Sequence, residues 1–249
     1  MMRTLRLLLL LLVLVSCKRE SKSLNKITAK NIAVTTTIAS SEKIDSVIAP
    51  YKEKLTAEMQ EVLTYAPKDF LKNNEGMQTS IGNLMADLCY RMANPIYKKK
   101  TNESIDFVML NNGGIRATIP QGKVTVERAF KLMPFENELV AVTLTGEKIT
   151  ELVDYFIKNK TAHPFCRNVN LKLTNNDYLL KIRGKDFDKN KSYTVLTSDF
   201  LQSGGDKMTF FKNPEKLTKL DCKMRDVIID YFKKVDTLQA SIDNRVIIE

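Results

Sequence analysis

The chain has 249 residues, of which 43% are hydrophobic and 27% are charged, and its formal net charge is +10. A chain of this length can bury a sizeable core, either as one large domain or as two small ones. The positive charge favours anionic partners such as a lipid surface, nucleotides or phosphorylated sugars. No recognisable nucleic-acid-binding module is present, so no nucleic-acid partner is expected.

The N-terminus has the pattern of a secretion signal. Arg3 and Arg6 precede an unbroken apolar run, Leu7–Val15, which is too short to span a bilayer as a helix. The run ends at Ser16-Cys17 and resembles the lipobox of bacterial lipoproteins, in which the cysteine becomes the lipid-bearing first residue. The alternative is a signal peptide cut elsewhere, with Cys17 lost or free.

The lipobox predicts a signal peptide at 1–16 and a lipidated Cys17. The Lys-, Ser- and Thr-rich composition that follows predicts a tether, so that 17–40 is the lipidated cysteine with its tether and 41–249 the folded domain. The mature chain is then exported and anchored to the bacterial membrane through its lipid, facing the periplasm or the cell surface. The remaining cysteines, Cys89, Cys166 and Cys222, show no CxxC or metal-knuckle spacing. One disulfide with a free thiol and three buried thiols both remain open.

The first half of the chain alternates predicted helices and strands, after a tether in which 32–38 alternates like a strand. Pro50 is expected to interrupt the first helix, with a second helical piece continuing from it, and Thr125 to cap a helix that Pro134 ends. In chain order the pattern predicts helices at 41–49 and 51–60, a strand at 61–65, a helix at 79–96, a strand at 106–110, a helix at 125–133, a strand at 139–144 and a helix at 147–157.

The second half is richer in strands. A hairpin is expected from its two alternating segments and their intervening turn, Asn175-Asn176-Asp177. In chain order the pattern predicts strands at 168–173, 178–183 and 193–197, a helix at 224–233 and a last strand at 246–248. Such a mixture of elements is typical of the α/β or α+β class.

Two predicted strands end in glycine loops that suit an anionic ligand. The first is followed by Asn111, Gly113, Gly114 and Arg116, which combine close backbone approach with an amide and a guanidinium. The second is followed by Phe200 and by Gly204-Gly205-Asp206. The alternative is that Asn-Gly is an ordinary turn and Arg116 a solvated charge.

Four motifs occur along the chain in this order: Gly82-Asn83-Leu84 with Asp87, Asn111-Asn112-Gly113-Gly114-Ile115-Arg116, Pro134-Phe135-Glu136-Asn137 followed by Leu144-Thr145-Gly146, and Phe200 with Gly204-Gly205-Asp206. Together they resemble the C-terminal domain of the 5′-nucleotidases, a family that includes UDP-sugar hydrolases and 2′,3′-cyclic phosphodiesterases. Asp230-Tyr231 and Asn244-Arg245-Val246 resemble the end of that domain. The resemblance implies a layered α/β/β/α domain with mixed sheets over 41–249.

The resemblance also implies roles for individual residues. Asn111 and Arg116 would contact the ribose side and the phosphate of a nucleotide, Phe135 and Phe200 would clamp the base, and Asp206 would accept hydrogen bonds from the ribose hydroxyls. For each ring, packing in the core is the alternative. The predicted substrate-binding residues are Asn111, Gly113, Gly114, Arg116, Phe135, Phe200, Gly205 and Asp206.

The chain departs from the family's full-length enzymes in two respects. Those enzymes hold two divalent metals in a separate metallophosphoesterase domain, whereas this chain has one histidine, His163, which we expect to be a solvated loop residue. No catalytic residue or metal ligand is therefore assigned. In the loop before Gly82, Glu75 and Met77 stand where the enzymes place arginines, and an anion there disfavours phosphate binding.

Three hypotheses follow. The first is that the chain is the nucleotide-recognising part of a 5′-nucleotidase-type hydrolase, inactive alone, with Mn²⁺ or Zn²⁺ held by a separate metallophosphatase subunit. The second is a nucleoside-binding lipoprotein without an enzyme partner. The third is a degenerate structural domain, which requires Phe135 and Phe200 to be buried in the core.

Overall fold

The computed structural model describes residues 24–73, 76–174 and 177–248. The chain divides into two units, Met1–Ile48 and Ala49–Glu249. The expected signal peptide, the lipidated Cys17 and the expected role of Glu75 fall outside the described residues. Within the described part of the chain, no helix is long and apolar enough to cross a membrane.

Two predictions for the N-terminal segment are wrong. Residues 32–38 form no strand, and every residue from 24 to 48 is exposed, so their alternation has no sheet to pack against. The second helical piece continues from the first, as expected, but Pro50 does not interrupt them, because helix α2 runs without a break from Glu42 to Met59. A proline removes one hydrogen bond, here to the Ser46 carbonyl, but the turns on either side can remain helical.

The body contains two four-stranded sheets and a two-stranded one among its described residues. In the central sheet, with strand order β2-β8-β4-β9, β2 pairs parallel to β8 and the other neighbours are antiparallel. In the second, with order β10-β5-β6-β7, β10 is parallel to β5. The strands are β1 (Val62–Ala66), β2 (Phe107–Val108), β3 (Gly122–Thr125), β4 (Glu138–Thr145), β5 (Val169–Leu173), β6 (Tyr178–Ile182), β7 (Lys185–Asp186), β8 (Ser192–Ser198), β9 (Lys216–Lys223) and β10 (Val246–Ile248).

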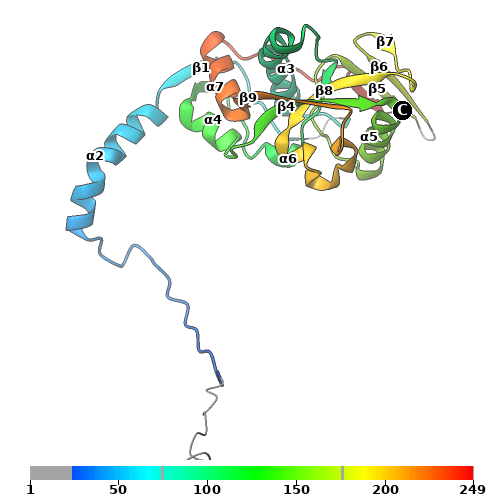
Figure 1. Ribbon diagram of the computed structural model, residues 1–249. Coiled ribbons are helices and arrows are strands. Elements are labelled where there is room, and N and C mark those ends of the chain that lie inside the picture. The colour runs from blue at the N-terminus through cyan, green and yellow to red at the C-terminus, as the bar shows by residue number, and fades with distance from the viewer. Residues whose placement is uncertain (1–23, 74–75, 175–176, 249) are drawn as a thin grey trace, which may run out of the picture. The chain divides into compact units, whose positions relative to one another are not determined.

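Helices cover the central sheet on both faces. In Figure 1, α3 lies above β4 and β8 in the view and α6 lies below them. Four consecutive residues of β4, from Leu139 to Val142, are buried, as expected for a strand covered on both faces. The helices of the body are α3 (Ser80–Thr101), α4 (Val126–Leu132), α5 (Gly146–Asn159), α6 (Asp199–Gln202) and α7 (Met224–Lys234). The predicted mixed α/β class is confirmed.

Several helix starts are set by capping side chains. Thr79 accepts a hydrogen bond from the Gly82 amide at 3.0 Å, and Ser198 accepts one from the Leu201 amide at 3.2 Å. Gly146, the first residue of α5, lies so close to the backbone of Lys189 that a Cβ would be 2.0 Å from its carbonyl oxygen. Only glycine fits at this position without a shift of the backbone.

Three strands were not expected from the sequence. In β9 only Leu220 is buried, and in β3 only Val124 is, so neither segment has the alternation that predicts a strand. Strand β7 has two residues, both exposed. Thr125 ends β3 and its side chain forms no capping hydrogen bond, so its predicted capping role is wrong.

The three cysteines of the body are free thiols. Cys89 and Cys166 are buried, as one of the two open interpretations requires, while Cys222 is only half-buried. Burial raises the pKa of the Cys166 thiol to about 12, which keeps it protonated.

The topology of the central sheet brings three loops to one edge. Strands β2 and β8 are parallel, so both end at the same edge, and antiparallel β4 begins there, with Leu139 opposite Ser198. The loop after β2 carries the Asn-Asn-Gly-Gly motif, the segment after β8 carries Phe200 and Asp206, and the segment before β4 carries Phe135. Residues from three distant parts of the chain therefore meet at this edge.

Candidate functional site

A cavity of about 250 Å³ lies at this edge of the central sheet. Seven of the eight residues predicted to bind substrate line it, and Gly205 is the exception. Asn137 also lines it; sequence reasoning quoted this residue in a motif but gave it no role. The lining residues are Asn111, Gly113, Gly114, Arg116, Phe135, Asn137, Phe200 and Asp206.

The two phenylalanine rings of the cavity are not core residues. Phe135 is 41% exposed and Phe200 is 42% exposed, whereas two core phenylalanines of the body, Phe107 and Phe165, are each 2% exposed. Phe135 precedes β4 and Phe200 follows β8, and because these two strands pair antiparallel, the two rings line one cavity at the same end of the sheet. The alternative that both are packed in the core is therefore wrong.

Asn111 and Asp206 join the two glycine loops. The Asn111 side-chain amide donates a 2.7 Å hydrogen bond to the Asp206 carboxylate, and the Tyr155 hydroxyl donates at 2.8 Å to the Asp206 backbone carbonyl. A Cβ on Gly114 would lie 2.7 Å from the Asn111 side-chain oxygen. The glycine thus gives the Asn111 side chain the space that this arrangement requires.

Gly205 lies against Phe200 and does not line the cavity. A Cβ at this position would be 2.5 Å from two carbon atoms of the Phe200 ring. Asp206 follows with φ of +52°, a conformation that aspartate tolerates better than most residues. Gly205 therefore acts on the ring and not on the cavity directly.

Two cations lie beside the Asn-Asn-Gly-Gly loop. Arg116 is exposed and donates to the Gly113 carbonyl at 3.3 Å, while Lys72 donates to the carbonyls of Ile115 at 2.6 Å and Asn112 at 3.2 Å. Burial, and then the charge of Arg116, lower the pKa of Lys72. Sequence reasoning did not single out Lys72, although it lies just before the loop in which cations were sought.

His163 is buried, contrary to the prediction that it is solvated. Its segment pairs with the strand before the cavity, since the Leu110 amide donates to the Pro164 carbonyl at 3.0 Å. The His163 ring lies 5.7 Å from the Tyr155 ring, and its Nδ1 accepts a 3.3 Å hydrogen bond from the Asn112 amide. Burial lowers the pKa of His163 to about 4, so the imidazole is neutral and supports the loop from beneath.

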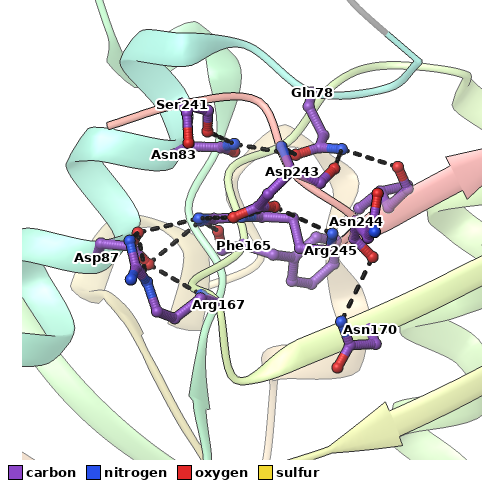
Figure 2. Close-up of polar contacts among 11 residues, drawn as sticks. Gln78, Asn83, Asp87, Phe165, Arg167, Asn170, Ser241, Asp243, Asn244 and Arg245 are labelled. Carbon is purple, nitrogen blue, oxygen red and sulfur yellow. Dashed lines mark hydrogen bonds and ion pairs between the residues drawn. The ribbon is translucent and has the colours of Figure 1, made fainter. Parts of the chain in front are cut away.

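The first family motif and the C-terminal Asn244-Arg245-Val246 segment form a structural network away from the cavity, drawn in Figure 2. Arg245 is 2% exposed and forms ion pairs with Asp87 at 3.0 Å and Asp243 at 2.7 Å. Asn83 donates to the Ser241 carbonyl and Gln78 to the Val246 carbonyl, at 2.9 and 2.8 Å. These contacts hold the C-terminal segment against the N-terminal half of α3.

The site has no group of residues suited to a metal ion. Across the described ranges 24–73, 76–174 and 177–248, no cluster of three or more His, Cys, Asp or Glu side chains could hold one. The side chains that line the cavity offer two aromatic faces, one carboxylate, two amides and a guanidinium.

Comparison with known families identifies the domain. Residues 62–213 match the family model described as 5′-nucleotidase, C-terminal domain. The chain belongs to this family. The match includes all eight predicted site residues and ends before β9, α7 and the C-terminal segment.

Characterised relatives are similar over most of this chain but are much longer. The cell wall protein Lmo0130 of Listeria monocytogenes is 27% identical over 225 residues, which cover 80% of this chain and 28% of that protein. The protein UshA of Escherichia coli is 24% identical over 224 residues, covering 86% of this chain and 38% of UshA. The chain thus spans well under half the length of these relatives.

Solved structures show the same fold. A 5′-nucleotidase precursor from Thermus thermophilus superposes with a TM-score of 0.67 at 21% identity, covering 82% of this chain and 42% of that one. A putative 5′-nucleotidase from Staphylococcus aureus gives a TM-score of 0.63 at 13% identity. The mixed α/β fold is therefore that of 5′-nucleotidase C-terminal domains.

Proposed function

We propose that this domain binds a nucleoside or a nucleotide in the cavity between Phe135 and Phe200. The observation that carries the proposal is the exposure of these two rings on one cavity that also contains a carboxylate. Stacking of a base on an aromatic side chain contributes ~1–3 kcal/mol and tolerates different bases. Two rings on one cavity suit a flat heterocycle better than a sugar or a peptide.

The ribose would bind at Asp206. A carboxylate has about four acceptor positions, so Asp206 can accept hydrogen bonds from two adjacent hydroxyls while it also accepts one from Asn111. The Tyr155 bond to the Asp206 carbonyl fixes the backbone on which this carboxylate is mounted. Because the loop is held in advance, ordering it on binding costs little conformational entropy.

A phosphate group would lie on the Arg116 side of the cavity. Arg116 offers a planar fork of donors suited to phosphate oxygens, and Lys72 adds a second positive charge beside it. The sequence had suggested that Glu75 would disfavour phosphate binding, whereas Lys72, three residues earlier, brings a positive charge to the Asn-Asn-Gly-Gly loop. The domain can therefore recognise a nucleotide as well as a nucleoside.

Hydrolysis would need a second component. The full-length relatives are more than twice as long as the part matched here, and phosphate-ester hydrolysis in this family rests on two divalent metals. We propose that a separate metallophosphatase subunit supplies Mn²⁺ or Zn²⁺, while this chain holds base and ribose and presents the phosphate. The lipid anchor at Cys17 would keep the chain at the membrane during nucleotide catabolism.

Two measurements on the purified chain test this proposal. Saturation-transfer NMR with adenosine and AMP is expected to show transfer to the base protons and to H1′, and its absence at millimolar ligand would contradict the binding role. Phosphate release from AMP in the presence of Mn²⁺ or Zn²⁺ is expected to stay at background. Robust turnover by the chain alone would show that no second component is needed.

A further inference from the structure

The loop 133–137, between α4 and β4, carries two of the cavity's lining residues, Phe135 and Asn137. The loop has no helix or strand of its own. The orientation of the Phe135 ring therefore depends on what holds the backbone of this loop from outside.

The first turn of α7 lies against this loop as a consequence of sheet topology. Strand β9 runs antiparallel to β4, with Lys223 opposite Glu138, so β9 ends where β4 begins. Helix α7 follows at Met224, whose amide donates a 2.9 Å hydrogen bond to the Asn137 carbonyl. Residue 225 is thus brought beneath the loop.

Arg225 makes a set of contacts that is confined to this region. Its side chain is 9% exposed, and Nη1 faces the carbonyls of Met133 and Phe135 at 3.4 and 3.5 Å. Nη2 forms an ion pair with the Glu136 carboxylate, and the guanidinium carbon lies 4.3 Å from the centre of the Phe130 ring. The Arg225 guanidinium therefore contacts three residues of the loop, namely Met133, Phe135 and Glu136.

Glu136 completes the arrangement from the solvent side. Its carboxylate also pairs with Lys223 at 2.5 Å, and its side chain is 59% exposed. The hydrogen bonds from Lys223 and Arg225 lower the pKa of Glu136 to about 2, so the carboxylate is ionised at any ordinary pH. The loop is thus held through its own Glu136 carboxylate, which pairs with the buried Arg225 guanidinium and with the exposed Lys223 ammonium.

We propose that Arg225 is a positioning residue that fixes the orientation of the Phe135 ring at the cavity. The importance of this orientation for ligand binding rests on the proposed nucleoside-binding function, whereas the orientation itself does not. Lysine cannot replace Arg225, because an ammonium group cannot reach two carbonyls and a carboxylate in one plane while stacking on Phe130. No residue of α7 itself lines the cavity.

Fluorine NMR tests the positioning without any ligand. The full chain is labelled with 4-fluorophenylalanine at Phe135 alone, or at Phe200 alone, and compared with the Arg225→Lys and Arg225→Met variants. Both variants are expected to shift and broaden the Phe135 resonance and to leave the Phe200 resonance unchanged. An unchanged Phe135 resonance in both folded variants would overturn the proposal.

Arg91→Met is the matched control. Arg91 also lies over an aromatic ring of α7, 5.8 Å from the centre of Tyr231, but its guanidinium donates to the Tyr231 hydroxyl and not to the loop, and it does not line the cavity. It is expected to leave both fluorine resonances unchanged, and equal changes in Arg91→Met and Arg225→Met would also overturn the proposal. If Arg225→Met does not fold, Arg225→Lys and Glu136→Gln provide the comparison.

A calorimetric titration then connects position to binding. Arg225→Lys is expected to weaken adenosine binding about fivefold or more through lost preorganisation, and Arg91→Met to leave it unchanged. Wild-type affinity in Arg225→Lys, with a displaced Phe135 resonance, would overturn the link between position and binding. If the wild-type chain does not bind adenosine, the proposed function fails, while the fluorine spectra still decide the role of Arg225.

Discussion

The Asn111 side-chain amide donates a 2.7 Å hydrogen bond to the Asp206 carboxylate, although 95 positions separate the two residues in the chain. The bond joins the loop after β2 to the segment after β8. Both loops carry glycines that allow a close approach, and both line one cavity with two exposed phenylalanine rings. The ribose-binding role proposed for Asp206 depends on this contact, since it orients the carboxylate before a ligand arrives.

Replacing Asp206 by asparagine is expected to weaken adenosine binding selectively. Hydrogen bonds to a charged group contribute about 1.5–3 kcal/mol, so the loss for adenosine should fall in that range. For 2′,3′-dideoxyadenosine, which lacks both hydroxyls, the loss should be small. Calorimetric titration of both ligands into both proteins measures the difference, with Asp186→Asn as a control at an exposed aspartate of β7. Equal losses for the two ligands would contradict a ribose contact.

Arg116 is expected to distinguish AMP from adenosine. Arg116→Gln should remove about 1.5–3 kcal/mol from AMP binding and leave adenosine binding nearly unchanged. The AMP preference of the wild-type chain should also shrink as salt rises, because Arg116 is exposed and its charge is screened. Lys185→Gln, at an exposed lysine of β7, serves as the control. If Arg116→Gln loses affinity for AMP and adenosine equally, Arg116 does not contact the phosphate.

Gly205→Ala is expected to act through Phe200. The added methyl group would lie 2.5 Å from the ring and must displace it, so adenosine affinity should fall roughly as far as in Phe200→Ala. Effects of residues in contact are not additive, and Gly205→Ala should therefore cost little more in a chain that already carries Phe200→Ala. A double-mutant cycle measures this coupling. Additive losses would mean that Gly205 serves the site in another way.

His163 is expected to make the stability of the body depend on pH. Its pKa is lowered by burial to about 4 in the folded chain, against about 6.5 in the unfolded chain. Between these values the unfolded chain binds a proton that the folded chain does not, so stability should fall as pH decreases from about 6.5 towards 4, by up to about 3 kcal/mol.

Urea unfolding at pH 7 and at pH 5 tests the role of His163, with His163→Gln as the variant in which this part of the pH dependence should disappear. The chain contains a single histidine, so a proton NMR titration of its ring reports one group without ambiguity. A midpoint near 6.5 would show that His163 is solvated, as the sequence alone had suggested.

The sequence predicted the parts of the site that lie in local motifs. Two glycine loops and two phenylalanines were recognised from sequence motifs. The structure brings seven of the eight residues predicted to bind substrate to one cavity. Most helices and strands were predicted because their apolar spacing is regular. The roles of these residues in binding remain predictions.

The sequence could not predict contacts that depend on distant pairing. His163 is buried because its segment pairs with 108–112, and Arg225 reaches the Phe135 loop because β9, a strand with one buried residue, pairs with β4. Lys72 is directed at carbonyls of a loop 40 positions away. Long polar side chains and edge strands carry little periodic signal, so only the assembled sheet determines where they lie.

Adenosine binding to the aromatic cavity is tested most directly by calorimetric titration of the purified chain and of its Phe135→Ala and Phe200→Ala variants. Tyr65→Ala, at an exposed aromatic residue of β1, is the control. We expect the wild-type chain and Tyr65→Ala to bind adenosine equally, and each phenylalanine variant to lose ~1–3 kcal/mol of binding free energy. Binding that survives the loss of both rings, or a wild-type chain that binds neither adenosine nor AMP, would contradict the proposed site.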